Sequence, residues 1–235
     1  MRSQVLTEGT EGSVFLWGRH SYGLREDKEA ESLTAEAAKR MGGLPYTLIA
    51  YEVQSWNGAF SPWPCRALDE SFFGGGERTL CWLLEELVPE VRSRFGRDRK
   101  VYLLGYSLAG LFSLWAMGQT EVFGGAGCCS GSLWYPGFLE WLKAAPRVRD
   151  RNIYISLGGK EAATGNRLMA GVAECTRETV ELLRQENAVK YELNPGGHFA
   201  DSGKRLSKAI WHLTQMERYS KTMPEKMGER GAEDE

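Results

Sequence analysis

A serine stands in a pattern that is typical of enzyme nucleophiles. Gly105-Tyr-Ser-Leu-Ala-Gly110 follows a short apolar run, residues 101–104, that predicts a buried strand, and the apolar residues 108–117 predict a helix. A serine at such a sharp strand-to-helix turn, with small residues two positions away on either side, forms a nucleophile elbow. Ala109 replaces the second glycine of the usual G-x-S-x-G pattern and adds little bulk. Ser107 is the candidate nucleophile; the alternative is an incidental serine in a strand-turn-helix unit.

A serine hydroxyl needs a base to take its proton, and histidine suits this role near neutral pH. The chain has three histidines. His198 follows a predicted strand in a Pro-Gly-Gly turn, and ligand sites of open α/β sheets gather at the carboxyl ends of strands. His212 lies inside the predicted last helix, and His20 comes too early for the chain order serine, acid, histidine. We therefore expect His198 to be the base.

The third member of such a site is an acid that holds the imidazole in one tautomer. Between Ser107 and His198, Glu161 is the carboxylate that comes directly after the carboxyl end of a predicted strand. Most of the others lie on a predicted helix, within a strand or before one. Two alternatives to Glu161 remain: a dyad in which a backbone carbonyl or water orients His198, and Asp201, which would break the chain order.

The negative charge that develops on a substrate oxygen needs N–H donors that are already in place. The backbone N–H of Leu108, directly after the candidate nucleophile, should be one of them. The second should come from the loop after an earlier strand, at Arg19 or His20. The sequence leaves the second donor open between these two residues.

Strands and helices alternate along the chain, and this order can bring the candidate residues to one edge of a sheet. We predict strands over residues 13–17, 46–53, 101–104, 122–129, 152–157 and 189–193, and helices over 27–41, 77–95, 108–117, 167–186 and 202–219. The alternation predicts an α/β fold, a three-layer α/β/α sandwich with a mostly parallel sheet. We expect one domain over residues 1–220 and a charged, flexible tail over residues 221–235.

Composition argues against several classes of partner. The 29 basic and 31 acidic residues nearly cancel, so we expect neither nucleic acid nor an anionic membrane surface as a partner. No run reaches the roughly 18 apolar residues of a membrane span, and the N-terminus lacks the apolar core of a signal peptide. Five cysteines without CxxC spacing favour free thiols and a cytoplasmic location. Three histidines far apart in sequence indicate no metal site, and we expect no cofactor.

An aromatic segment follows the predicted strand 46–53. Trp56 and Asn57 open it, and Phe60 and Trp63 follow. Because this segment lies at the same edge of the sheet as the candidate nucleophile, its aromatic rings can stack on a flat ligand, with Trp56 and Asn57 as candidate substrate-binding residues. The alternative is a hydrophobic plug that closes this part of the fold.

The motifs together resemble the α/β-hydrolase superfamily and, within it, the esterases related to esterase D, a group that includes feruloyl and siderophore esterases and mycolyltransferases. The resemblance spans residues 13–219 and rests on segments 105–110, 129–134, 158–161 and 196–198. It implies a minimal hydrolase fold, and the short chain leaves no room for a large lid. Many relatives carry a His-Gly pair where this chain has Gly18-Arg-His20.

The resemblance also implies roles for individual residues. Ser107 matches the family's nucleophile, Glu161 its acid and His198 its base. Segment 130–134 matches the part of the family that lines the substrate cleft, with Ser130, Ser132 and Trp134 as candidate contacts.

The leading hypothesis is a serine hydrolase that cleaves a small-molecule carboxylic ester through an acyl-enzyme on Ser107. One alternative is acyl transfer to an alcohol on the same scaffold. Another is a non-catalytic binding protein that keeps the hydrolase fold, because a fold does not by itself imply a function. The presence of all three residue types at the expected places argues against the binding protein. The identity of the acyl and alcohol groups stays open.

Overall fold

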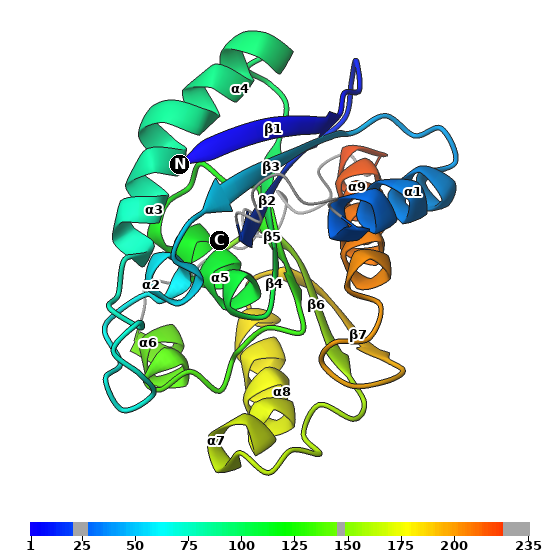
Figure 1. The fold of residues 1–235 in the computed structure, drawn as a ribbon. Coiled ribbons are helices and arrows are strands. Elements are labelled where there is room, and N and C mark those ends of the chain that lie inside the picture. Colours follow the sequence, from blue (N-terminus) through cyan, green and yellow to red (C-terminus); the bar gives the residue numbers. More distant parts are fainter. Residues whose placement is uncertain (21–27, 145–148, 223–235) are drawn as a thin grey trace, which may run out of the picture.

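Seven strands form one sheet in the computed structural model of the chain, which describes residues 1–20, 28–144 and 149–222 (Figure 1). The strand order is β1-β3-β2-β4-β5-β6-β7. β1 pairs antiparallel with β3, and the other pairs are parallel. The strands are β1 (Arg2–Thr7), β2 (Val14–His20), β3 (Thr47–Val53), β4 (Val101–Tyr106), β5 (Gly125–Cys129), β6 (Asn152–Gly158) and β7 (Ala188–Asn194). Because β2 to β7 are parallel, their carboxyl ends meet at one edge of the sheet.

Helices cover both faces of the sheet, as the predicted three-layer sandwich requires (Figure 1). α1 (Lys28–Met41) and α9 (Ser202–Thr222) pack on one face, where their apolar side chains join those of β2 to β6 in one core cluster. The opposite face carries α5 and the helical segment from α3 to α4 in a second cluster. The helices of this second layer are α2 (Trp56–Phe60), α3 (Gly76–Trp82), the π-helical turn η1 (Leu83–Leu87), α4 (Val88–Phe95), α5 (Leu108–Gln119), α6 (Phe138–Ala144), α7 (Arg167–Ala170) and α8 (Val172–Leu183).

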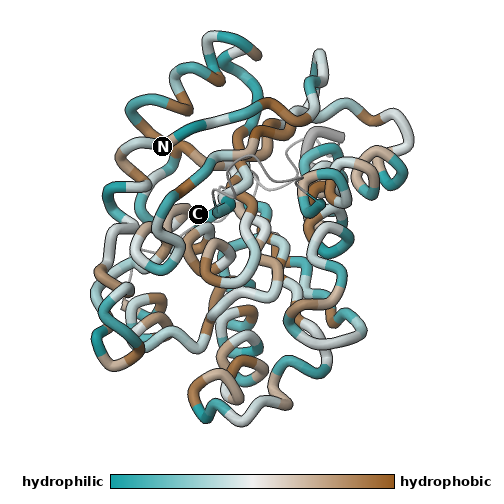
Figure 2. Tube along the Cα trace, viewed as in Figure 1, coloured by the Kyte–Doolittle hydropathy of each residue, from teal (hydrophilic) through white to brown (hydrophobic). Residues whose placement is uncertain are grey.

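The centre of the sheet is apolar and fully covered. Every residue of β4 is buried, and every residue of α5 from Leu108 to Met117 is buried as well. A helix that is apolar all round is buried on all sides, and Figure 2 shows hydrophobic residues following the central strands. The turn between β4 and α5 is therefore anchored on both sides by packed core elements.

The sheet differs from the sequence prediction at its first strands. β1 was not predicted because its first three residues are polar and exposed, which hides the strand pattern at the sheet edge. β2 continues past the predicted end at Trp17 to His20, because Gly18, Arg19 and His20 keep their parallel pairing with β3. Arg19 and His20 therefore lie in a strand and not in the loop after it.

Two helical segments also differ from the prediction. The predicted helix over residues 167–186 is interrupted at Gly171, where α7 ends and α8 begins. The Asn166 side chain accepts hydrogen bonds from the Leu168 and Met169 N–H groups, and this cap starts α7 as a separate short helix. The aromatic segment after β3 contains the short helix α2, and α6 was not predicted.

The domain limits, residues 1–220, stay a prediction. α9 extends to Thr222, and residues 223–235 of the predicted tail lie outside the described residues. In the part of the chain that the structure describes, no helix is long and apolar enough to cross a membrane.

Candidate active site

Ser107 occupies the strained turn between β4 and α5. Its backbone has φ 57° and ψ −123°, a conformation that a residue with a side chain rarely adopts. Strand and helix come so close that a Cβ on Gly105 would lie 2.1 Å from the carbonyl oxygen of Ala109. A Cβ on Gly110 would lie 3.2 Å from the Cys128 sulfur. The small residues of the elbow are therefore required by the turn, which holds the Ser107 hydroxyl away from the core.

Three side chains form a continuous chain of hydrogen bonds at the carboxyl edge of the sheet. The Ser107 Oγ lies 3.0 Å from His198 Nε2, and His198 Nδ1 lies 2.8 Å from Glu161 Oε2. Ser107 follows β4, Glu161 follows β6 and His198 follows β7. The parallel sheet thus brings the three predicted residues together. Because Nδ1 is bonded to Glu161, neither the dyad nor the Asp201 alternative describes this geometry.

Glu161 is an ionised, almost fully buried carboxylate with both oxygens bonded. Its Oε1 accepts hydrogen bonds from the Gly158 N–H at 2.6 Å and from Arg205 Nη1 at 2.8 Å, which leaves Oε2 for the imidazole. Burial raises the pKa of Glu161, but hydrogen bonds with His198, Ser130 and the Gly158 backbone outweigh it, and the net pKa lies below its ordinary value. Glu161 can therefore orient His198 and offset the charge of its protonated form.

Arg205 is a site residue that the sequence analysis did not single out. It lies near the start of α9 with a side chain only 2% exposed, and it is paired with Glu161. A signal was present in the sequence: Arg205 shares the spacing of the buried apolar residues of α9, namely Leu206, Ala209, Ile210 and Leu213. A charged residue in an apolar helix stripe indicates a buried partner.

Backbone geometry separates the two candidates for the second N–H donor. The Val14 N–H donates to the Lys100 carbonyl on the β4 side of β2, and N–H groups alternate in direction along a strand. The His20 N–H therefore points toward the β4 side, and the Arg19 N–H points toward β3. The β2–β4 pairing ends with Trp17 opposite Leu104, three residues before His20 and Ser107, and both of these residues line the same cleft. This geometry favours His20.

The Leu108 N–H has the position expected of the first donor. It is the first amide of α5, and amides of a first helical turn have no acceptor within the helix. The Arg19 side chain is engaged elsewhere, since it pairs with Glu52 at 3.3 Å. The role of each donor stays a prediction.

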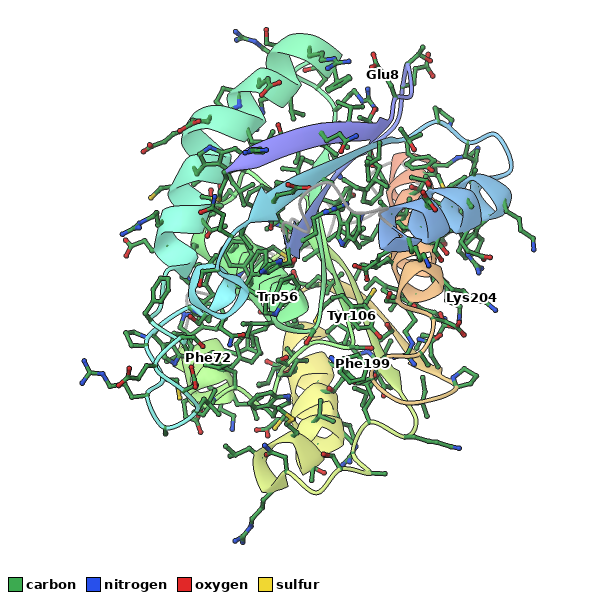
Figure 3. The ribbon with its side chains drawn as sticks, viewed as in Figure 1. Glu8, Trp56, Phe72, Tyr106, Phe199 and Lys204 are labelled. Atoms are coloured by element: carbon green, nitrogen blue, oxygen red, sulfur yellow. The ribbon has the colours of Figure 1, made fainter. Side chains whose placement is uncertain are left out.

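A cleft of about 260 Å³ opens beside the Ser107 hydroxyl. Trp56, Tyr106 and Phe199 line it together with Ser107 and His198, and Figure 3 shows the three aromatic side chains around the carboxyl ends of the central strands. Phe199 is 96% exposed and can contact a ligand at the mouth of the cleft. A larger cleft, of about 330 Å³ between β3 and α3, shares no lining residue with this one.

The other predicted contacts are not among the described residues that line the cleft: Asn57, Ser130, Ser132 and Trp134. The Ser132 Oγ lies 3.3 Å from the Ser107 Oγ and faces the site. Ser130 is fully buried and its hydroxyl accepts a hydrogen bond from Arg205, so it lies behind the cleft rather than in it. The Asn57 side chain donates a hydrogen bond to the Ser71 hydroxyl.

The cysteines near the site are not reactive groups. All five cysteines are free thiols, as predicted. Burial raises the pKa of Cys129 to about 12, and burial also raises the pKa of Cys128 well above its ordinary value. Both therefore keep their protons near neutral pH. The described residues contain no group of three or more side chains suited to hold a metal ion.

Known proteins share both sequence features and the fold. A family model described as "Putative esterase" matches residues 55–204. An IroE-like serine hydrolase from Shewanella oneidensis superposes with a TM-score of 0.72 at 16% identity, over 91% of this chain and 80% of that one. The siderophore hydrolase EstA from Aspergillus nidulans superposes with a TM-score of 0.62 at 18% identity, over 87% of this chain and 83% of that one.

The enterobactin esterase FES from Shigella flexneri superposes with a TM-score of 0.65 at 20% identity, over 91% of this chain but only 55% of that one. At these identities the three structures show a shared fold, that of the α/β hydrolases. A comparison with curated protein sequences finds no match.

Proposed function

Because the chain belongs to the esterase family whose model matches residues 55–204, and is thus a carboxylic ester hydrolase, we propose that it acts through an acyl-enzyme on Ser107. One observation carries this proposal: the unbroken hydrogen-bond chain from the Ser107 hydroxyl through His198 to Glu161. A hydroxyl, a base and an orienting acid in this order are the parts that nucleophilic catalysis by serine needs.

In the first step, Ser107 attacks the carbonyl carbon of the ester. With the Nδ1 proton of His198 directed at Glu161, Nε2 is free to accept the Ser107 proton across 3.0 Å. The imidazolium that forms faces the Glu161 carboxylate. The negative charge that develops on the substrate oxygen is stabilised by the N–H groups of Leu108 and His20.

In the second half of the reaction, His198 acts first as an acid and then as a base. His198 gives its proton to the leaving alcohol, which departs and leaves the acyl group on Ser107. A water molecule then loses a proton to Nε2 and attacks the acyl carbonyl, and proton return to the Ser107 oxygen releases the carboxylic acid. If an alcohol takes the place of this water, the product is a new ester, so product analysis with added alcohols separates hydrolysis from acyl transfer.

A replacement of the nucleophile tests the mechanism. Ser107→Ala should lower kcat for p-nitrophenyl acetate by about 10⁶-fold and abolish labelling by a fluorophosphonate, because the attacking oxygen is gone. Ser132→Ala is the matched control: it removes the neighbouring hydroxyl, and Ser107 should still be labelled. Hydrolysis at the wild-type rate by pure, folded Ser107→Ala protein would refute the mechanism.

The same assay can address the substrate class. Two structures of this fold are named as a siderophore hydrolase and an enterobactin esterase. A set of test substrates should therefore contain siderophore esters as well as acetyl and feruloyl esters. A substrate of this enzyme should lose its turnover in Ser107→Ala, whereas background hydrolysis should not.

A further inference from the structure

The guanidinium of Arg205 lies at the centre of the site's supporting structure. Its side chain is only 2% exposed, and a buried charge is stable only when it is paired and hydrogen-bonded. Three side-chain oxygens surround Nη1, and two backbone carbonyls accept hydrogen bonds from Nη2. The Nη1 partners are Tyr106 at 3.1 Å, Ser130 at 2.6 Å and Glu161 at 2.8 Å, and the Nη2 partners are the carbonyls of Pro195 at 3.0 Å and Gly197 at 2.8 Å.

These partners come from the ends of four neighbouring strands. Tyr106 precedes the nucleophile at the end of β4, Ser130 follows β5, and Glu161 follows β6. The two carbonyls belong to the loop after β7 that carries His198. Tyr106 also donates a hydrogen bond from its hydroxyl to the His198 carbonyl. One planar cation from α9 therefore joins the segments that hold the nucleophile, the acid and the base.

We propose that Arg205 is a positioning residue for the ester hydrolysis: it fixes Glu161 and the His198 loop in the geometry that lets His198 accept the Ser107 proton. Arg205 does not line the cleft and touches neither Ser107 nor the space beside it, so it acts through other residues. This inference rests on the proposed function of Ser107.

The division of the two Glu161 oxygens supports this role. Arg205 and the Gly158 N–H both donate to Oε1, which sets the rotation of the carboxylate and directs Oε2 at His198 Nδ1. On the other side, the hydrogen bonds to Pro195 and Gly197 hold the backbone directly before His198. Acid and base are thus tied to the same rigid group.

The glycines of two sequence motifs make room for this guanidinium. A Cβ on Gly158 would lie 2.8 Å from both Arg205 Nη2 and Glu161 Oε1. Gly196 has φ +86° and lies between the two carbonyls that Arg205 binds, and its own carbonyl is 2.6 Å from the position of a Gly158 Cβ. The glycines of segments 158–161 and 196–198 therefore leave space for the Arg205 side chain and its hydrogen bonds.

The positive charge also affects proton transfer. Arg205 Nη1 lies 2.8 Å from Glu161 Oε1, and a fixed cation at this distance opposes the addition of a proton to that carboxylate. Burial raises the pKa of Tyr106 to about 12 and that of Cys129 to about 12, so both stay neutral. Other charged or titratable groups on the elements around this part of α9 include Glu192 on β7 and Arg40 on α1, together with Lys204, Lys208 and His212 on α9 itself.

Two replacements separate charge from geometry. Arg205→Met removes both, and kcat for p-nitrophenyl acetate should fall about 100-fold, the scale of a small misplacement of catalytic groups. KM should change less than about threefold, because the cleft wall is intact. The acidic limb of the kcat/KM profile should move up by about 1 pH unit, since the opposing charge is gone. Arg205→Lys keeps the charge, so the limb should stay in place while kcat falls about tenfold.

Lys208→Met is the matched control. Lys208 lies on the same helix and pairs with Glu192 on β7, away from the cleft, so its loss removes a positive charge from α9 without touching the site. This variant should keep kcat and the pH profile of the wild type. Circular dichroism of every variant normalises kcat to folded protein.

The outcomes distinguish this inference from the proposed mechanism. If Ser107→Ala is inactive but folded Arg205→Met keeps kcat within about threefold, the Arg205 inference alone is overturned. Equal losses in the Met and Lys variants with unmoved pH profiles would also overturn it, because they would indicate a structural role. If Arg205→Met does not fold, Arg205→Lys decides: wild-type kcat in that variant would show that the planar guanidinium is not needed.

Discussion

Replacing Glu161 by glutamine should trap His198 in the wrong tautomer. A glutamine amide has one oxygen and one NH2 group, and they must fill the positions of Oε1 and Oε2. Both neighbours of Oε1, the Gly158 N–H and Arg205 Nη1, are donors, so the amide oxygen must take that position. The NH2 group then faces His198 Nδ1, which must accept, and the ring proton is forced onto Nε2. Nε2 can then no longer take the Ser107 proton.

The structure sets the size of this effect. Turning the amide round would break one neutral hydrogen bond and one bond to a charged donor, together about 2–4 kcal/mol. At about 1.4 kcal/mol per factor of ten, the productive orientation falls to a few per cent or less. The carboxylate that faces the imidazolium across 2.8 Å is lost as well. We therefore expect kcat to fall by about 10³- to 10⁴-fold, the scale known for acid-to-amide changes in serine triads.

Steady-state hydrolysis of p-nitrophenyl acetate measures the loss, and nitrogen NMR of the imidazole reports which ring nitrogen carries the proton. Glu192→Gln is the matched control, because Glu192 also faces a histidine, His212, at 3.5 Å but lies away from the cleft. It should keep wild-type kcat. A folded Glu161→Gln protein with more than a tenth of the wild-type kcat, or with its Nδ1 still protonated, would refute the reasoning.

Two further changes test the surroundings of this carboxylate. Gly158→Ala places a Cβ 2.8 Å from Arg205 Nη2 and should lower kcat at least about tenfold, whereas Gly159→Ala, with its nearest neighbour at 3.6 Å, should retain activity in the same assay. The pKa values of Glu161 and Glu192 lie below the ordinary 4.5. Both carboxylates therefore add to the free energy of unfolding above pH 4.5, and this stabilisation is lost as the pH falls through their folded-state pKa values. In urea unfolding between pH 7 and 3, the free energy of unfolding should therefore fall below about pH 4.5, and it should fall less steeply in Glu192→Gln than in the wild type. The same pH dependence in both proteins would contradict this prediction.

The sequence was sufficient to predict that the three candidate catalytic side chains lie together, because each follows a parallel strand. Ser107, Glu161 and His198 are distant in sequence, but the carboxyl ends of parallel strands meet at one edge, so strand order alone predicts that they converge. The elbow adds a local signal, since Gly105 is needed wherever strand and helix backbones approach so closely. Both signals depend on neighbouring residues and on the order of elements, which a single sequence contains.

Residues that act through long-range contacts were harder to predict. Ser130 lies in a motif that suggests a cleft residue, but the packing of α9 against β5 covers it with Arg205. The choice between Arg19 and His20 as the candidate second N–H donor could not be made from the sequence, because it depends on how far β2 continues beside β3. Edge strand β1 is stabilised by pairing with β3 and has little pattern of its own.

The sequence by itself predicted the layered α/β fold and the three residues that we propose as nucleophile, base and acid, because strand and helix periodicity and the elbow glycine are local properties of the chain. Only the tertiary structure decided what holds those groups at 3.0 Å and 2.8 Å from one another. Arg205 reaches Glu161 across 44 positions of sequence and Ser130 across 75. No local pattern specifies such contacts. They arise when α9 packs on the sheet and brings the buried guanidinium of Arg205 to the ends of four strands.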